Sequence, residues 1–170
     1  MELVLAFRIV HILTAIFWAG SVAFLTLVLG PHLRRRGPQE EMRVMGPLSA
    51  LVGKVLGAVS LTVLASGVGL VLAMHGGNTG AVLFGTGWGY AILTGFLATT
   101  GAILIAFGGI KPTGDRLRLL GPRLATANPH PPAEAVAEVQ RLVKRLHRLE
   151  NLEFGLVALA GVMMALARYL

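Results

Sequence analysis

Four long apolar stretches, separated by polar segments, dominate the hydropathy pattern of this chain. They cover residues 3–30, 47–74, 88–110 and 149–170. Each is long enough for the roughly 20 apolar residues that an α-helix needs to cross a bilayer. The pattern therefore predicts an all-α, four-helix transmembrane bundle. A length of 170 residues suits one integral membrane domain over residues 1–170.

The polar segments predict how these helices are connected. Glycines in the run from His75 to Gly80 predict a flexible loop between the second and third stretches. Prolines within residues 128–132 predict a helix break. From Ala133 onward, apolar residues recur at helical spacing. Residues 133–170 are therefore expected to form one nearly continuous helix, amphipathic at first and membrane-spanning later.

The distribution of basic residues predicts the orientation. Of 15 Lys and Arg, five lie in residues 31–54 and eight in residues 111–148, whereas residues 75–87 carry no charge. Basic loops stay on the cytoplasmic side of a membrane. We therefore expect cytoplasmic loops at about 31–46 and 111–148, both termini outside, and a helical cytoplasmic extension before the fourth span. The expected location is the cell (inner/plasma) membrane.

Composition narrows the class of protein and its partners. Only 14% of the residues are charged, against roughly 25% in soluble domains. The net charge of +7 lies beside the apolar stretches, so it suits lipid headgroups and not nucleic acid. No cysteine is present, which excludes disulfides, thiolate metal sites and covalent haem attachment. Expected partners are the lipid bilayer and, through small-residue helix faces, a second copy or a respiratory complex.

His11 is the main candidate for chemistry because it lies inside the first apolar stretch. A titratable group at membrane depth usually pairs with another group or coordinates a ligand. Arg8 and Trp18 share its helical face. These residues suggest a haem b site, with His11 on the iron, Arg8 on a propionate and Trp18 as a pocket wall. Alternatively, Arg8 extends to the outer headgroups and His11 only hydrogen-bonds to a neighbouring helix.

The predicted orientation sorts the remaining histidines into two levels. His75 belongs to the outer level of His11 and is a candidate second ligand. His32 and His147 belong to the inner level, where they form a secondary candidate pair. Helical bundles build cofactor sites from such inward-facing side chains on neighbouring helices.

Copper is the competing ligand. Cu(I) prefers thioether and imidazole donors. Met74 and His75 are adjacent, and Met163 and Met164 should lie near the same outer side as His11. Methionine is also an ordinary gap-filling residue between helices, so packing is the alternative interpretation of the methionines.

Lys54 is a further unusual residue, about two turns inside the second apolar stretch. Glu150 and Glu153 enter the fourth stretch at a comparable depth. An ion pair between Lys54 and either glutamate is expected, because charges in membranes are usually paired. The functional alternative for Lys54 and Glu153 is a proton path or a propionate anchor.

A family resemblance follows from these residues. The stretch with His11, Trp18 and Gly20, running to Pro31, resembles the first helix of the copper-resistance protein D superfamily. The run from Ser66 to Leu70 resembles the glycine-containing end of that family's second helix. The superfamily includes the J-type membrane protoporphyrinogen oxidases, which are four-helix proteins that bind haem b.

This resemblance implies that His11 is the haem residue, and His32 stands where the helix often ends in a second histidine. The chain lacks the Pro-Arg pair after Gly20 and the third-span lysine of the oxidases. It carries no catalytic motif of its own, so oxidase activity is implied by resemblance alone. Three functions are carried forward: a haem b protein of electron transfer or haem and redox metabolism, a copper-binding or copper-transport protein, and a cofactor-free accessory subunit of a respiratory complex.

Overall fold

The structure is a computed structural model that describes residues 1–126 and 133–170. The helix break predicted at residues 128–132 lies outside the described residues. Within them the chain is all-helical, as predicted. In chain order the elements are α1 (Glu2–Ala23), the π-helical η1 (Phe24–Leu29), α2 (Gly30–Arg36), α3 (Pro38–His75), the 3-10 helix η2 (Gly76–Asn78), α4 (Thr79–Gly85), α5 (Gly87–Ile105), the π-helical η3 (Ala106–Ile110), α6 (Lys111–Thr126), α7 (Ala133–Leu166) and the 3-10 helix η4 (Ala167–Tyr169).

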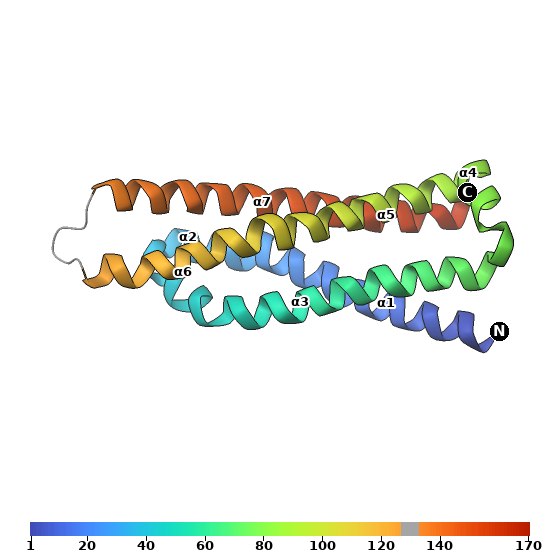
Figure 1. Cartoon of the computed structure of the whole chain (residues 1–170), viewed down its shortest axis with the longest axis horizontal. Coiled ribbons are helices and arrows are strands. Elements are labelled where there is room, and N and C mark those ends of the chain that lie inside the picture. Colours follow the sequence, from blue (N-terminus) through green and yellow to red (C-terminus); the bar gives the residue numbers. More distant parts are fainter. Residues whose placement is uncertain (127–132) are drawn as a thin grey trace.

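Four continuous helical segments are long and apolar enough to cross a membrane: Glu2–Arg36, Arg43–Gly85, Gly87–Leu120 and Ala133–Tyr169. The protein is therefore a multi-pass membrane protein with one helix for each predicted stretch. Both termini lie at the same end of the bundle (Figure 1). We call this end the terminal end. The opposite end, which carries α2, the start of α3, α6 and the start of α7, is called the basic end.

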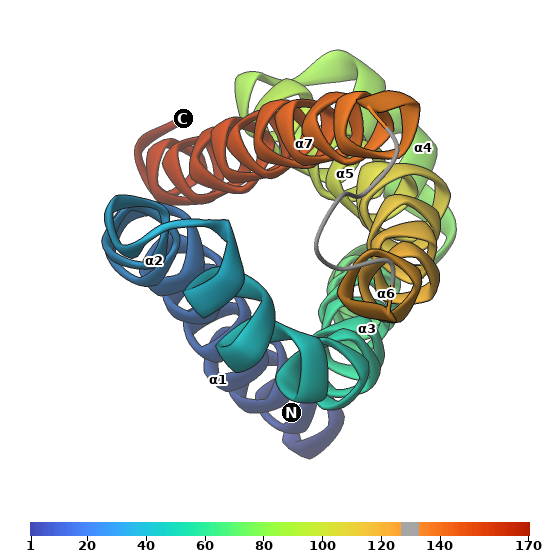
Figure 2. The same ribbon diagram turned by 90° about the vertical axis from the view of Figure 1, so that its left-hand side faces the viewer.

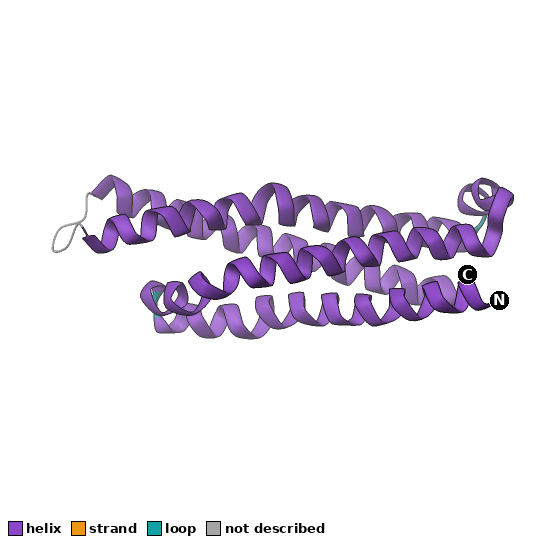
Figure 3. Cartoon of the chain, turned by 60° about the horizontal axis from the view of Figure 1, so that its bottom comes forward, coloured by secondary structure: helices purple, strands orange, loops and turns teal. Residues whose placement is uncertain are grey.

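The prediction of a loop after His75 is wrong, because this segment is mostly helical. Residues 76–78 make a 3-10 turn and residues 79–85 make α4, so little irregular chain remains between the second and third spans (Figure 3). Local hydrogen bonds hold this cap in place. Thr79 Oγ1 donates to the Gly76 carbonyl, and Tyr90 Oη donates to the Phe84 carbonyl. These bonds satisfy backbone oxygens near the membrane, where unpaired polar groups are costly.

The bundle consists of two antiparallel hairpins. α1 packs mainly on α3, and α5 packs mainly on α7, with fewer contacts between the two pairs (Figure 2). A central apolar cluster joins the hairpins: Trp18, Val22, Val63, Ala102, Ile103 and Val157. Burial of these side chains is expected to hold the two pairs together, because close packing drives helix association in membranes.

Each hairpin has a π-helical segment immediately before an X-Pro step. The Gly30 amide donates to the Leu25 carbonyl before Pro31, and the Lys111 amide donates to the Ala106 carbonyl before Pro112. Proline has no N–H to continue the α-helical pattern. The wider turn therefore supplies a hydrogen-bond partner where the α-helical one is lost.

A bend in α3 shapes the basic end. The first turns of α3 cross this end from α2 towards α6 before the helix runs along the bundle (Figure 2). Pro47 lies inside α3. It removes one hydrogen bond and clashes with the preceding turn, which kinks a helix. Residues 39–45 belong to the helix that continues into the second span.

We place the membrane boundary at the basic end near Lys54 and Lys111, because of their spacing from His75 and Trp88. Lys54 lies 21 residues before His75, a rise of about 31 Å, which matches a hydrocarbon core of about 30 Å. Lys111 follows Trp88 by a similar distance. His75 and Trp88 then mark the boundary at the terminal end. These two levels allow each candidate residue to be placed by depth.

Candidate functional site

His11 packs directly against the backbone of α3. Its Nδ1 lies 2.9 Å from the Val63 carbonyl oxygen and 3.3 Å from Ser66 Oγ. A carbonyl can only accept, so Nδ1 carries a proton and donates a hydrogen bond to the Val63 carbonyl. In the neutral form of this tautomer, Nε2 carries the lone pair. This bond to a neighbouring helix, together with an exposed Arg8, is the arrangement expected under the alternative interpretation of His11. Ligating histidines are oriented by a carbonyl or carboxylate in the same way.

Gly67 makes this close approach of the imidazole feasible. A Cβ atom at position 67 would lie 2.9 Å from His11 Cε1, which is closer than real side chains come. Gly67 lies eight residues, or about 12 Å, from His75 along α3. His11 is therefore near the middle of the membrane and does not lie in the headgroup layer.

Trp18 and Arg8 do not enclose the imidazole. The Trp18 side chain is only 4% exposed and lies in the central cluster with Val63 and Val157. It fills the core and does not wall a pocket. Arg8 is exposed. In this structure, neither side chain is in position for its expected role, which was to wall the haem pocket for Trp18 and to bind a propionate for Arg8.

A recess of about 550 Å³ opens on the α1–α3 surface next to His11. Its walls are largely apolar and include Phe7, Val10, Ala65 and Ser66. The His11 ring does not line the recess, but Val10 precedes it in the chain and Ser66 contacts it. With about 100° between successive residues, Arg8 lies about 60° round the helix from His11, on the flank away from Val10. Arg8 does not line the recess.

His75 is separated from His11. Its ring makes an edge-on contact with Trp88 of α5, with the centroids 4.9 Å apart. His75 Nε2 is buried and has no hydrogen-bond partner among the described residues. Because the two histidines differ in depth by about 12 Å and face different helices, the structure does not bring them together as a ligand pair.

The methionines of the expected copper site are also dispersed. Met74 is exposed on α3. Met163 and Met164 pack on Gly95 of α5, where an added Cβ would meet the Met164 methyl at 2.9 Å. No group of three or more His, Cys, Asp or Glu with metal-binding geometry occurs in residues 1–126 and 133–170. Packing therefore accounts for the two methionines of α7.

The inner histidines do not form a pair either. His32 is exposed on α2. His147 Nε2 lies 3.2 Å from Glu41 Oε1, joining α7 to the segment of α3 that crosses the basic end. Glu150 is within electrostatic range of His147, Arg34 and Glu41. A mixed cluster of charges, and not a histidine pair, therefore occupies this level.

The expected ion pair of Lys54 is not formed. Lys54 is exposed, and neither Glu150 nor Glu153 lies within ion-pair distance of it. Its position at the membrane boundary explains this, since a lysine there can extend into the headgroups. Glu153 lies deeper. A Cβ atom at Gly109 would contact Leu149, and Glu153 is four residues further along α7, which places it about 9 Å inside the level of Lys111.

Two partners of His11 were missed by the sequence reasoning, namely the Val63 carbonyl and Gly67. Counting residues from the terminal end of each helix would have found them, because His11 and Gly67 are nearly equidistant from that end. The Glu41–His147 contact had no comparable signal, since it depends on the bend of α3 at Pro47.

The comparisons with known proteins add no relative. No protein-family model, no curated protein and no solved structure matches the chain.

Proposed function

We propose that this protein, in the cell membrane, binds haem b through Nε2 of His11 and serves in electron transfer or in haem and redox metabolism. The observation that carries the proposal is the hydrogen bond from His11 Nδ1 to the Val63 carbonyl. It leaves Nε2 as the basic nitrogen of a ring at membrane depth. The resemblance of residues 8–31 to the copper-resistance protein D superfamily supports the same residue.

The recess beside His11 is the candidate space for a haem held by a single protein nitrogen, although the imidazole does not line it. The apolar walls of the adjacent recess suit a porphyrin face, and the recess volume of about 550 Å³ gives it space. Binding requires the recess to widen past Val10 and Ser66 towards the ring. Arg8 has no part in this arrangement.

Within this proposal, each residue has a defined task. The Val63 carbonyl orients the imidazole, and Ser66 Oγ lies beside the same nitrogen. Gly67 lets the ring lie flat on α3. Trp18 and its neighbours exclude water from below the site. A bound haem would supply one-electron chemistry, and the protein would supply its axial nitrogen and its apolar surroundings.

The test is an absorption spectrum of the purified protein, expressed with ample haem. We expect a Soret band and a reduced-minus-oxidised α band in the wild type, and their loss in His11→Ala. His32→Ala is the matched control, because His32 is exposed on the same apolar helix. It should keep both bands. Loss of the bands in both variants, or their retention in His11→Ala, contradicts the proposal.

The same sample separates the other functions by metal analysis. Stoichiometric copper without a Soret band would replace the proposal with a copper protein. A colourless, metal-free protein that copurifies with a larger oxidase or reductase would replace it with an accessory subunit. The geometry does not favour the copper alternative, since the methionine donors are dispersed.

A further inference from the structure

A groove at the basic end opens where α3 bends. It has a volume of about 360 Å³ and lies between the bend and α6. Met45 and Pro47 line it from α3, and Leu117 lines it from α6. Its surface is mostly apolar, although it lies beyond the boundary marked by Lys54 and Lys111.

Two glycines keep this groove open. A Cβ atom added at Gly46 or at Gly114 would meet nothing within 4 Å. Both glycines line the groove, one from each wall. They differ from Gly67 and Gly95, whose added Cβ atoms would collide with packed side chains. The free volume at Gly46 and Gly114 is therefore not used for helix packing within the chain.

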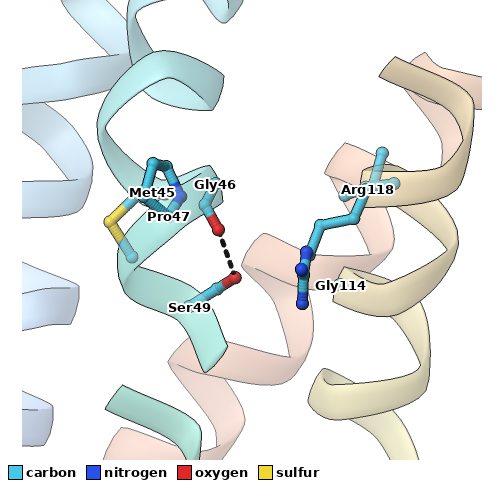
Figure 4. Close-up of a pocket in the computed structure, with 7 residues that line it drawn as sticks. Met45, Gly46, Pro47, Ser49, Gly114 and Arg118 are labelled. Carbon is cyan, nitrogen blue, oxygen red and sulfur yellow. Dashed lines mark hydrogen bonds between the residues drawn. The ribbon is translucent and has the colours of Figure 1, made fainter. Parts of the chain in front are cut away.

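One cation faces the groove. The guanidinium end of Arg118 extends from α6 towards Ser49 on α3 (Figure 4). Ser49 Oγ donates to the Gly46 carbonyl and keeps that oxygen paired. Among the described side chains, the ion pairs are Arg43–Glu40 and His147–Glu41, so Arg118 has no acidic partner there. The groove thus combines apolar walls with a single uncompensated positive charge.

The groove begins within the headgroup layer and extends a few ångströms beyond it. Gly114 lies three residues past Lys111 and Arg118 lies seven past it, or about 4 to 10 Å beyond the hydrocarbon core. The polar layer on each side of a bilayer is about 5 to 7 Å thick. A lipid phosphate in the adjoining leaflet is therefore within reach of Arg118.

We propose that this groove binds an anionic phospholipid, with its phosphate on Arg118 and its glycerol and upper acyl chain against Met45, Pro47 and Leu117. Guanidinium groups bind phosphate through two parallel hydrogen bonds. Basic pockets between membrane helices at this level are suited to acidic headgroups. The proposal is independent of the haem site, which lies in the other half of the membrane.

The test is native mass spectrometry of the whole protein in detergent, titrated with phosphatidylglycerol or with phosphatidylcholine. We expect one bound phosphatidylglycerol per chain, with about tenfold lower affinity in Arg118→Gln, as for the loss of one charge-assisted contact. Gly114→Leu should lower binding of both lipids, because it fills the groove and leaves the charge in place. Arg116→Gln is the matched control, since Arg116 is exposed on α6 and does not line the groove.

Three outcomes would overturn the proposal. Equal losses in Arg116→Gln and Arg118→Gln would show a diffuse surface charge and no site. Displacement of the lipid by millimolar inorganic phosphate would identify a free anion as the ligand. Unchanged binding in Gly114→Leu, with the helix content and melting temperature of the wild type, would show that the groove is not used.

Discussion

The two hairpins of the bundle share a plan but use their glycines differently. In α5–α7, glycines receive flexible aliphatic side chains, with Gly95 facing Met164, Gly101 facing Leu156 and Gly109 facing Leu149. In α1–α3, Gly67 and Gly69 receive rings, those of His11 and Phe7. Glycines therefore serve only helix packing in the α5–α7 hairpin, whereas in the α1–α3 hairpin Gly67 also makes room for a titratable side chain.

Polar bonding separates the hairpins further. His11 of α1 bonds to a backbone carbonyl of α3 at membrane depth, whereas Thr94 and Thr100 of α5 bond back to their own helix. α5 buries small residues along its length, including Ala91, Ala98 and Ala102. Chemistry is thus expected in the first hairpin and mechanical stability in the second.

The largest expected effect is that of Trp18→Ala. Trp18 belongs to the first hairpin but packs with Val157 and Ala102 of the second, so its loss should leave a cavity between them. We expect a loss of about 3–5 kcal/mol in the free energy of unfolding, measured by denaturant titration in mixed micelles. Phe17→Ala is the control, because Phe17 is 51% exposed. Equal losses in the two variants would mean that Trp18 does not join the hairpins.

The next effect sharpens the contrast between the glycines. In Gly67→Ala the new methyl group meets an imidazole that is held by a hydrogen bond, which should cost about 1–3 kcal/mol by overpacking. In Gly95→Ala it meets the end of the flexible Met164 side chain, so the unfolding free energy should change by less than about 1 kcal/mol. Thermal melts of both variants check this. Matching melting temperatures would remove the distinction between the hairpins.

A smaller effect concerns the feature that the hairpins share. Pro31→Ala and Pro112→Ala each restore an amide N–H after a π segment. A new backbone hydrogen bond should add about 0.5–1.5 kcal/mol of local stability. Amide hydrogen exchange over residues 24–31 and 106–112 should slow in the respective variant. Faster exchange in either variant would contradict the assignment of the π segments to their prolines.

The smallest effect is expected at an exposed ion pair of α3. Arg43 hydrogen-bonds to Glu40 at 2.7 and 2.9 Å, and this bond lowers the pKa of the Glu40 carboxyl. A lowered folded-state pKa adds stability above the ordinary glutamate range, and this stability is lost as the pH falls through the lowered value. Arg43→Gln should return the pKa towards its usual value, as measured by carboxyl NMR. At neutral pH the melting temperature should hardly change, because exposed ion pairs contribute little.

Much of the fold could be predicted from the sequence. Apolar stretches of about 20 residues have few alternatives to spanning helices, and helical spacing from Ala133 onward gave the continuity of α7. The turn after His75 was mispredicted because glycine content indicates freedom, whereas Thr79 and Tyr90 supply specific hydrogen bonds.

The candidate site was predictable only as far as its central residue. Depth identified His11, but its partner is a backbone carbonyl, which no side-chain pattern marks. Helical spacing placed Trp18 on the same face of the helix as His11. It could not show that, two turns further along, this face packs against Val157 of α7. The sequence also placed Met163 and Met164 at the same level as His11. It could not show that these methionines pack on α5.

The apolar cluster around Trp18 separates two polar levels of the bundle. It lies between the imidazole on one side and Glu153 on the other, at the levels of Val63 and Val157. Close apolar packing at this height is expected to hinder a chain of water molecules between the imidazole and the carboxylate. Both ionisable groups can then lie within the bundle without forming one continuous polar path.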